Sequence, residues 1–314
     1  MQIIFGPVNS RRFGSSLGVD LSPQTKQCNF DCLYCELAPA APVAKQNYVV
    51  SVDEVLDALK EHLDEKIDVI TITANGEPTL YPHLDELVER IDAVKGKTKT
   101  LILTNAATLS DENVYKTLLK FDKVKLSLDA VTPQTFKKID RPQKHIHIED
   151  IIDAVQHFSK EYKGELYIEI LFVKGINDSD EEIAKLNEVL LGLENVTRVD
   201  IGTIDRPPAY PVEPLSYEEL HTIAKKFDAS LPIHIASRKH TEQIVPLSYS
   251  KEEICNTLDK RPLTMEDIEI LFDKESQKRL QELIQEGQIT TKNVGSLEFF
   301  LPSKNFLRKR AKSS

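Results

Sequence analysis

Three cysteines lie close together near the N-terminal end of the sequence. The segment CNFDCLYC places them at Cys28, Cys32 and Cys35, whereas Cys255 is far downstream. Clustered thiolates favour metal ligation over a disulfide framework. A zinc site needs a fourth ligand, and no other Cys or His lies between residues 20 and 50. On a [4Fe-4S] cluster, three cysteines leave one iron free to bind another molecule, so the spacing predicts a cluster with an open iron.

The spacing CxxxCxxC, with the aromatic residue Tyr34 before the last cysteine, resembles the cluster motif of the radical S-adenosylmethionine superfamily. The resemblance implies a [4Fe-4S] cluster and S-adenosylmethionine as cofactors. It also implies that an electron passed through the cluster, from a donor such as flavodoxin or ferredoxin, cleaves the cofactor to methionine and a 5'-deoxyadenosyl radical. That radical abstracts a hydrogen atom from the substrate. The protein orients these groups and excludes solvent.

A second motif, TANGEPTLYP, follows the second predicted strand and resembles the GGEP segment of the same superfamily, with Asn75 in place of the first glycine. The resemblance implies that Gly76 and Glu77 lie at the cofactor. A carboxylate at that point can accept hydrogen bonds from the cofactor's ammonium group. Taken alone, NGEP is an ordinary strand-to-helix turn. Its position after the second strand favours the cofactor role.

A third motif, KLSLD, ends with two polar residues that alternate with leucines. Ser127 and Asp129 are two apart, so on a strand they face the same side. The resemblance implies that they bind the ribose hydroxyls or the methionine end of the cofactor, together with Asn105 at the end of the preceding strand. The alternative for Asp129 is a helix cap or a turn, where aspartate is common.

Two further candidates lie on later strands. Glu169 is within the apolar run YIEILFV, where an unpaired buried carboxylate is costly. Contact with cofactor or substrate is favoured over a structural ion pair, and both remain open. Ile204, at the end of RVDIGTI, resembles a position that packs against the adenine ring. The sequence identifies no residue that acts directly on the substrate.

The N-terminal segment GPVNSRRFGSSLGVDL and the CELAP that follows the cysteines resemble a bacterial branch of the radical enzymes grouped with wyosine synthases. The superfamily resemblance covers residues 1 to about 237. Wyosine synthases of this group carry more cysteines for a second cluster, whereas here only Cys255 remains. A second cluster is therefore not expected, and Cys255 is interpreted as a small buried helix residue.

Between residues 17 and 237, short β-branched runs alternate with amphipathic stretches, which is typical of a parallel sheet connected by helices. Six strands are predicted, at 17–21, 68–73, 100–105, 123–129, 166–173 and 198–204. Helices are predicted at 51–65, 82–94, 110–120, 149–162, 179–193 and 216–228. Ser51, with Glu54 three residues on, and Ser110 are expected N-caps. Periodicity leaves open a doubly wound sheet or a partly closed barrel; the resemblance implies an α/β fold with a partial (βα)6 radical SAM barrel.

The pattern changes after about residue 240, so we predict a core domain at 1–240 and a smaller domain at 241–314. Three helices and a hairpin turning at Gly295-Ser296 suggest a winged helix that ends in a basic tail. The third helix is nearly neutral, so duplex DNA is not an expected partner. Its core face is predicted at Leu280, Leu283 and Ile284.

Composition narrows the function classes further. The net charge of −10 argues against a surface built to hold nucleic acid, and no apolar run approaches a membrane span. With no signal-peptide core at the N-terminus, a cytoplasmic protein without a membrane partner is expected. The leading hypothesis is an enzyme acting on a tRNA base or a peptide. The alternative is an iron–sulfur redox-sensing regulator, which leaves NGEP and KLSLD unexplained.

Overall fold

The computed structural model describes most of the chain in two compact units. The residues described are 3–10, 13–63, 66–235, 246–260, 262–294 and 297–303. The larger unit holds the described residues up to 235 apart from 205–207, and the smaller unit holds 205–207 and the described residues from 246 on. Each unit has buried hydrophobic residues of its own. No helix in the described ranges is long and apolar enough to cross a membrane.

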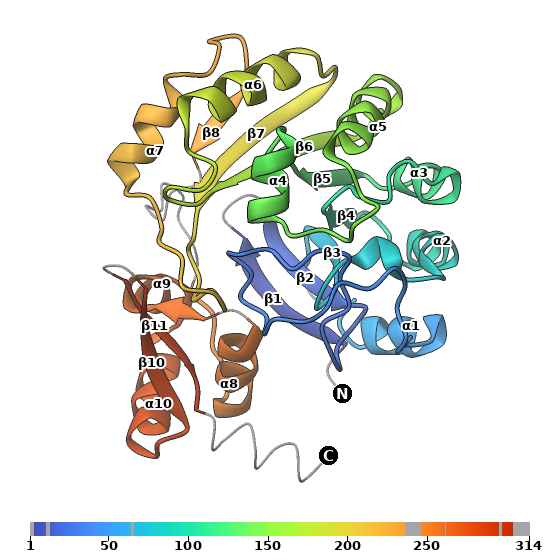
Figure 1. The fold of residues 1–314 in the computed structure, drawn as a ribbon. Coiled ribbons are helices and arrows are strands. Elements are labelled where there is room, and N and C mark those ends of the chain that lie inside the picture. The colour runs from blue at the N-terminus through green and yellow to red at the C-terminus, as the bar shows by residue number, and fades with distance from the viewer. Residues whose placement is uncertain are drawn as a thin grey trace. The chain divides into compact units, whose positions relative to one another are not determined.

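The larger unit is built on one eight-stranded sheet whose strands pair in chain order (Figure 1). β1 (Ile4–Ser10) is antiparallel to β2 (Gly14–Asp20). Each later strand runs parallel to the one before it: β3 (Val69–Thr73), β4 (Lys99–Thr104), β5 (Lys123–Ser127), β6 (Glu165–Phe172), β7 (Val196–Thr203) and β8 (Ile233–Ile235). Because the carboxyl ends of parallel strands meet at one edge, the loops that follow them converge there.

Helices connect successive parallel strands, and their apolar faces bury the sheet. They are α1 (Val52–Lys60), the 3-10 helix η1 (Pro78–Leu80), α2 (Leu84–Val94), α3 (Glu112–Leu118), α4 (Pro133–Ile139), α5 (Ile148–Glu161), α6 (Asp180–Leu191) and α7 (Tyr217–Ala224). Figure 1 shows α1, α2, α3 and α5 next to one another along the outside of the sheet. The buried residues of α1, α2 and α5 recur every three or four positions, as a helix with one apolar face requires.

The sequence predicted the six central strands, each within a few residues of its bounds, but it missed β1, β8 and α4. β1 has an irregular register between Phe5 and Val8, which interrupts the alternation that marks a strand. β8 has three residues, too few to show a pattern. α4 is a seven-residue helix that follows Thr132 as N-cap, with proline at its first position.

One of the two predicted helix caps was correct. Ser51 forms the predicted capping box, since its hydroxyl accepts from the Glu54 N–H and the Glu54 carboxylate accepts from the Ser51 N–H at 2.8 Å. Ser110 was the wrong residue for α3. Asp111 is the N-cap there, and its carboxylate accepts from the N–H groups of Asn113 and Val114. An ionised carboxylate is a stronger acceptor than a hydroxyl at a helix start.

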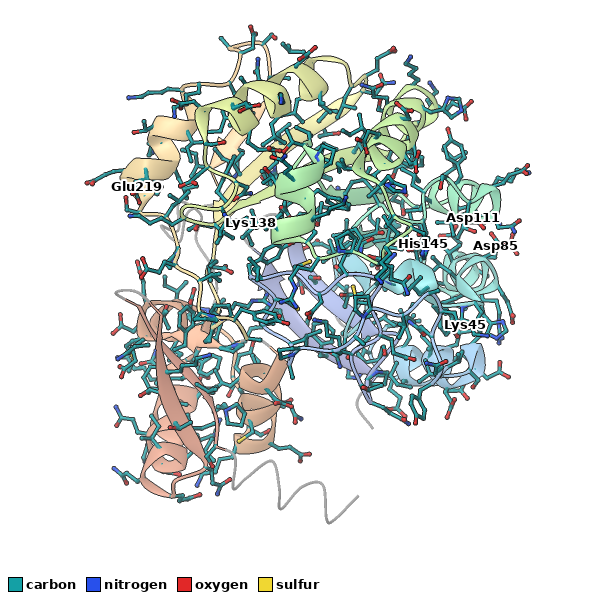
Figure 2. All side chains as sticks on the ribbon, in the orientation of Figure 1. Lys45, Asp85, Asp111, Lys138, His145 and Glu219 are labelled. Atoms are coloured by element: carbon teal, nitrogen blue, oxygen red, sulfur yellow. The ribbon has the colours of Figure 1, made fainter. Side chains whose placement is uncertain are left out.

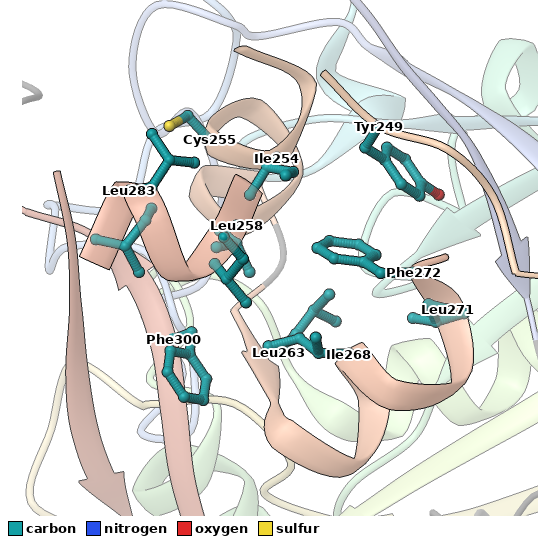
Figure 3. Close-up of a cluster of buried hydrophobic side chains, with 12 residues drawn as sticks. Tyr249, Ile254, Cys255, Leu258, Leu263, Ile268, Leu271, Phe272, Leu283 and Phe300 are labelled. Carbon is teal, nitrogen blue, oxygen red and sulfur yellow. The ribbon is translucent and has the colours of Figure 1, made fainter. Parts of the chain in front are cut away.

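The smaller unit contains three helices and a three-stranded antiparallel sheet within its described residues. Its elements are α8 (Lys251–Lys260), β9 (Leu263–Thr264), α9 (Met265–Leu271), α10 (Lys274–Gln285), β10 (Ile289–Val294) and β11 (Leu297–Pro302), and the strand order is β10-β11-β9. Figure 3 shows its core, and Cys255 belongs to a cluster of buried side chains from all three helices and all three strands of this unit. Cys255 is 2% exposed, as predicted.

The predicted core face of α10 was partly wrong. Leu280 and Leu283 are buried, but Ile284 is 36% exposed. Ile284 lies one residue, roughly 100° of helix, beyond Leu283 and falls outside a narrow buried stripe. The predicted turn at Gly295-Ser296 and the basic tail lie outside the described residues.

Candidate functional site

The loop that carries the three cysteines follows β2 and joins the sheet at the NGEP motif. The Gln27 N–H donates to the Asn75 carbonyl at 2.8 Å, and the Glu77 N–H donates to the Gln27 carbonyl at 3.0 Å. Gly76 has φ +137°, and a Cβ there would lie 2.0 Å from the Gln27 carbonyl oxygen. Only glycine therefore permits this approach of the cysteine loop to the end of β3.

The Gln27 side chain ties the two ends of the same loop together. Its Oε1 accepts from the N–H groups of Asn47 and Tyr48, at 2.5 and 3.0 Å. Its Nε2 donates to the Ser22 hydroxyl and the Tyr48 carbonyl, both at 2.8 Å. Gln27 is 2% exposed, so these bonds are protected from water. The cysteines consequently lie on a loop with a closed base.

The C-terminal end of α4 holds the middle of the cysteine loop. The N–H groups of Asp31 and Leu33 donate to the carbonyls of Asp140 and Ile139, at 3.1 and 2.8 Å. The rings of Phe30 and Phe136 pack edge to face, 5.5 Å apart. The helix that the sequence missed is therefore one of the supports of the cysteine motif.

The loop after β7 contacts the cysteine loop from another side. The Ala209 N–H donates to the Cys35 carbonyl at 2.8 Å. The Tyr210 hydroxyl donates to the Asp31 carboxylate, and the Arg141 guanidinium lies 3.4 Å from that carboxylate and 4.5 Å from the centre of the Tyr210 ring. The three cysteines are thus held by segments that follow β3, β5 and β7 as well as by their own strand.

The three thiols lie in surroundings that disfavour a bare negative charge. Burial raises the pKa of Cys28 to about 12, and the nearby Glu77 carboxylate adds to the increase. Burial, followed by the Asp140 carboxylate, raises the pKa of Cys32 well above its usual value. Burial also raises the pKa of Cys35, against the opposing charge of Lys26. Thiols of this kind become thiolates when a metal binds, and they release their protons as it does.

The donor set fits a cluster better than a single ion. The Phe30 N–H and the Asn105 Nδ2 lie 3.4 and 3.8 Å from Cys28 Sγ, where they can stabilise a thiolate. In the part of the chain that the structure describes, no three His, Cys, Asp or Glu side chains are arranged to hold one metal ion. The thiolates of a [4Fe-4S] cluster bind different irons and need not converge on one point.

Four of the predicted cofactor residues line one small cavity of about 20 Å³, beside Phe30 and Asp140. They are Tyr34, Asn105, Ser127 and Asp129. An adjoining groove of about 230 Å³ shares Ile151 in its wall and includes Asn29, whose Oδ1 accepts from Asn105 Nδ2 at 2.7 Å. His145, labelled in Figure 2, is another residue of this groove. The sequence prediction therefore brought together residues from the cysteine loop and the ends of β4 and β5.

Asp129 is a strongly perturbed carboxyl in this cavity. Its oxygens accept from the Tyr34 hydroxyl at 2.5 Å and from the Leu171 N–H at 2.6 Å. Burial raises its pKa to about 7, although both hydrogen bonds oppose that increase. β5 ends at Ser127, so Asp129 lies just beyond the strand rather than on it. It joins the loop after β5 to the cysteine loop and to β6, and a role toward the cofactor stays a prediction.

Glu77 is buried and accepts hydrogen bonds from within the protein that the sequence did not predict. It is 2% exposed. Its Oε1 accepts from the N–H and hydroxyl of Thr79 and from the Thr104 hydroxyl, and its Oε2 accepts from the Asn105 N–H at 2.8 Å. Burial raises the pKa of Glu77, against these four hydrogen bonds. The carboxylate joins the carboxyl ends of β3 and β4, and its contact with the cofactor's ammonium group remains a prediction.

The last two predicted residues lie on β6 and just after β7. Glu169 forms an ion pair with Lys125 at 2.5 Å, so the structure shows the ion pair that the sequence left as the alternative. Both charges act on Asp129, which indicates that they lie near the cavity. Ile204 is 3% exposed just after β7, and its contact with an adenine ring stays a prediction.

Sequence reasoning missed Lys26, Asp31 and Asp140. All three lie next to the cysteines, but a single Lys or Asp in a loop is ordinary turn composition. Asp140 is 4% exposed and hydrogen bonds the Cys32 side chain. The sequence offered one signal for this group, the position of Asp31 between Cys28 and Cys32. A carboxylate buried beside metal-ligating cysteines needs a cation nearby.

Comparison with known proteins agrees with this site. Residues 23–186 match the family model described as the radical SAM superfamily. A UPF0026 protein from Helicobacter pylori is 42% identical over 95% of this chain and 97% of its own length. A radical SAM methyltransferase from Sphaerobacter thermophilus (18% identical, TM-score 0.56) aligns over 73% of this chain and 68% of its own. TYW1 with a lysine-pyruvate adduct bound (20% identical, TM-score 0.51) aligns over 72% and 76%.

The chain belongs to the radical SAM superfamily, and UPF0026 proteins are among its relatives over nearly the full length of both chains. The superfamily's cofactors are a [4Fe-4S] cluster and S-adenosylmethionine, as the sequence predicted. The two solved structures are similar in fold, which confirms the α/β radical SAM fold with its parallel sheet. The superfamily is enzymatic, so the chain is an enzyme of this class.

Proposed function

We propose that S-adenosylmethionine binds across the small cavity lined by Tyr34, Asn105, Ser127 and Asp129 and the adjoining groove, beside a [4Fe-4S] cluster held by the three cysteines. When bound, these cofactors supply reductive cleavage to methionine and a 5'-deoxyadenosyl radical, with flavodoxin or ferredoxin as electron donor. The radical takes a hydrogen atom from a tRNA base or a peptide.

One observation carries this proposal: polar groups from three separate segments meet at one cavity next to the cysteines. Asn105 follows β4, Asp129 follows β5, and Tyr34 lies between Cys32 and Cys35. A zinc site or a redox sensor needs the thiols but has no use for these three side chains. A cofactor with an amino acid end and a ribose end needs hydrogen-bonding groups of this kind.

The chain's own residues orient and enclose the cofactors. Asn105 would lie between the cluster and S-adenosylmethionine, because its Nδ2 contacts Cys28 Sγ and Asn29 Oδ1. Asp129 supplies a buried carboxyl that accepts from the Tyr34 hydroxyl and that would accept from a ligand hydroxyl in its place. The phenylalanine pair on the cysteine loop and α4 excludes water from the same region.

The smaller unit supports a substrate of macromolecular size. Its three helices and antiparallel β10–β11 pair are compatible with the winged helix that the sequence predicted, and we propose that this unit recognises a partner surface. The exposed side of α10 mixes Glu275 and Glu282 with Lys278 and Arg279, and Lys251 pairs with Glu282 at 3.0 Å. That balance gives duplex DNA no electrostatic attraction. Duplex DNA is therefore not the proposed partner.

The redox-sensing regulator receives no support from the comparisons, because the superfamily is enzymatic. Anaerobic reconstitution with iron and sulfide, reduction with dithionite, and addition of S-adenosylmethionine test the proposed chemistry directly. We expect 5'-deoxyadenosine by chromatography from the wild-type chain and from Cys255→Ser, and none from Cys28→Ser. Mass spectrometry of tRNA nucleosides and peptides from a deletion strain would then identify the substrate. A wild-type chain that holds the cluster but releases no 5'-deoxyadenosine contradicts the proposal.

A further inference from the structure

A polar row crosses the four neighbouring strands β5, β6, β7 and β8 (Figure 1). In the register of these parallel strands, Ser127 lies next to Glu169, and Glu169 lies next to Asp200. His234, on the last strand of the sheet, lies next to Asp200. Residues paired in this way point to the same face of a sheet, and strands about 4.8 Å apart make the row about 14 Å long. Its Ser127 end lines the proposed cofactor cavity.

The opposite face of the same strands is apolar. Leu126, Ile168 and Ile201 are each one position away from a member of the row, and all three are completely buried. Strands of a parallel sheet are usually apolar on both faces, so the polar row departs from the ordinary pattern. Glu169 and His234 are also accessible, since their side chains are 30% and 50% exposed. A polar molecule can therefore contact this face beside the cofactor cavity.

The two acidic residues of the row are paired with cations on the same face. Lys125 and Arg198 each lie two positions before a member of the row, so they point to the same side. Lys125 forms an ion pair with Glu169 at 2.5 Å, and the Arg198 guanidinium donates to Asp200 Oδ2 at 3.1 Å. Because these charges compensate one another, the row is suited to hold a ligand through hydrogen bonds rather than through net charge.

Asp200 orients the imidazole ring of His234. Its Oδ1 lies 3.0 Å from His234 Nδ1, and the Asp200 side chain is completely buried whereas that of His234 is half exposed. An ionised carboxylate only accepts hydrogen bonds, so it favours the ring form that carries a proton on Nδ1. In a neutral ring of that form, Nε2 is a hydrogen-bond acceptor.

We propose that this face is the substrate side of the site. His234 Nε2 accepts a hydrogen bond from an N–H or O–H group of the substrate, and Asp200 is the positioning residue that keeps the proton on Nδ1. The substrate extends from the cofactor cavity at Ser127 toward β8, so the contact is made away from the hydrogen atom that is abstracted. The inference rests on the proposed function, because it requires S-adenosylmethionine to bind at that cavity.

Two substitutions distinguish the two ring nitrogens. The amide nitrogen of His234→Asn takes the place of Nδ1 and keeps the bond to Asp200, but nothing replaces the acceptor at Nε2. The amide oxygen of His234→Gln reaches the place of Nε2 and can accept there. His157→Asn is the matched control, because His157 is 66% exposed on α5 and lies 3.9 Å from the carboxylate of Glu161.

The assay measures 5'-deoxyadenosine released by the reconstituted full-length chain, alone and with the tRNA or the peptide fraction of an extract from a deletion strain. The matching fractions of the parent strain, whose substrate is already modified, are the blank. All variants should release the product equally without extract. His234→Asn should need about five- to tenfold more of the stimulating fraction than the wild type, as expected for one lost hydrogen bond. His234→Gln should need less than His234→Asn, and His157→Asn should equal the wild type.

Two failures are distinguishable. If the wild type releases no 5'-deoxyadenosine without extract, the proposed function is wrong, and this inference is wrong with it. If it does, but His234→Asn responds to extract as the wild type does, only the present inference is overturned.

If neither fraction stimulates the wild type, nitrogen-15 NMR of the histidine rings decides, at a pH about two units above the usual histidine pKa. An unprotonated Nε2 on His234, with both ring forms present in Asp200→Asn, supports the proposal. A protonated Nε2 in the wild type overturns it.

Discussion

Glu77 offers a direct test of whether the NGEP carboxylate holds the fold as well as the cofactor. Replacing it with alanine removes the acceptor of four hydrogen bonds. The two hydroxyl donors can adapt, since Thr79 also bonds Thr108 and the Thr104 hydroxyl, which accepts from the Ala106 N–H, can rotate its hydrogen toward another acceptor. The backbone N–H groups of Thr79 and Asn105 lose the carboxylate that satisfies them in the structure.

The size of the effect follows from those two groups. A buried donor left without a partner costs about 1–3 kcal/mol, so two of them lower the free energy of unfolding by about 2–6 kcal/mol. That is a large share of the roughly 5–15 kcal/mol of a typical domain. Glu77→Gln keeps an oxygen for the Thr79 and Thr104 donors but turns an amide N–H toward Asn105. Its cost is therefore about 1–3 kcal/mol, between wild type and alanine.

The assay is urea unfolding of the apoprotein without S-adenosylmethionine, followed by circular dichroism because the chain has no tryptophan. Glu181→Ala is the control: Glu181 is an exposed partner of Lys185 one helical turn away, and its loss should cost no more than about 0.5 kcal/mol. If Glu77→Ala unfolds at the same urea concentration as the wild type, the carboxylate serves only the cofactor and the structural argument is wrong.

Three further predictions follow from the same contacts. Cys28→Ser should lose the cluster absorbance at roughly 400 nm, whereas Cys255→Ser should keep it; equal loss in both would contradict the three-cysteine assignment. Gly76→Ala should reduce iron incorporation, because its Cβ would lie 2.0 Å from Gln27, while Gly96→Ala, with φ +61° and open space, should not. Burial raises the pKa of Asp122, but Lys95 and its other donors hold that pKa below its usual value. Urea unfolding should thus show Asp122→Asn about 1–2 kcal/mol less stable than wild type at pH 7. The difference should start to close below about pH 4, where the carboxyl of the unfolded chain is protonated, and should continue to close as the pH falls toward the lowered pKa of the folded state; a constant difference would refute this.

The residues that sequence reasoning located are those with a local spacing signal. The cysteine motif, NGEP and KLSLD each combine a fixed spacing with a position at the end of a predicted strand. In parallel α/β folds those ends meet, so it was possible to predict that Tyr34, Asn105, Ser127 and Asp129 share one site. The six central strands were predictable for a related reason, because their buried runs are continuous.

The residues that sequence reasoning missed act through contacts distant in sequence. Asp31 meets Tyr210 from 179 positions away, and Gln27 meets Tyr48 across the closed base of the cysteine loop. Neither pairing has a periodic pattern, because each depends on which loops the finished sheet brings together. Glu77 was located correctly, but its four internal hydrogen bonds depend on the end of β4 and were not foreseeable from NGEP.

These contacts also explain how a loop can hold a reactive site with little secondary structure of its own. The segment from Ser22 to Tyr48 has no helix, yet the ends of β3 and α4 and the loop after β7 each donate or accept a backbone hydrogen bond with it. A loop secured at several separate points loses its conformational entropy when the sheet folds, before any cofactor arrives. The cost of ordering the cysteines is then met by folding rather than by cluster binding. A preorganised ligand loop of this kind suits a cofactor site with a reactive intermediate, because a loop that moves little does not open the site to solvent.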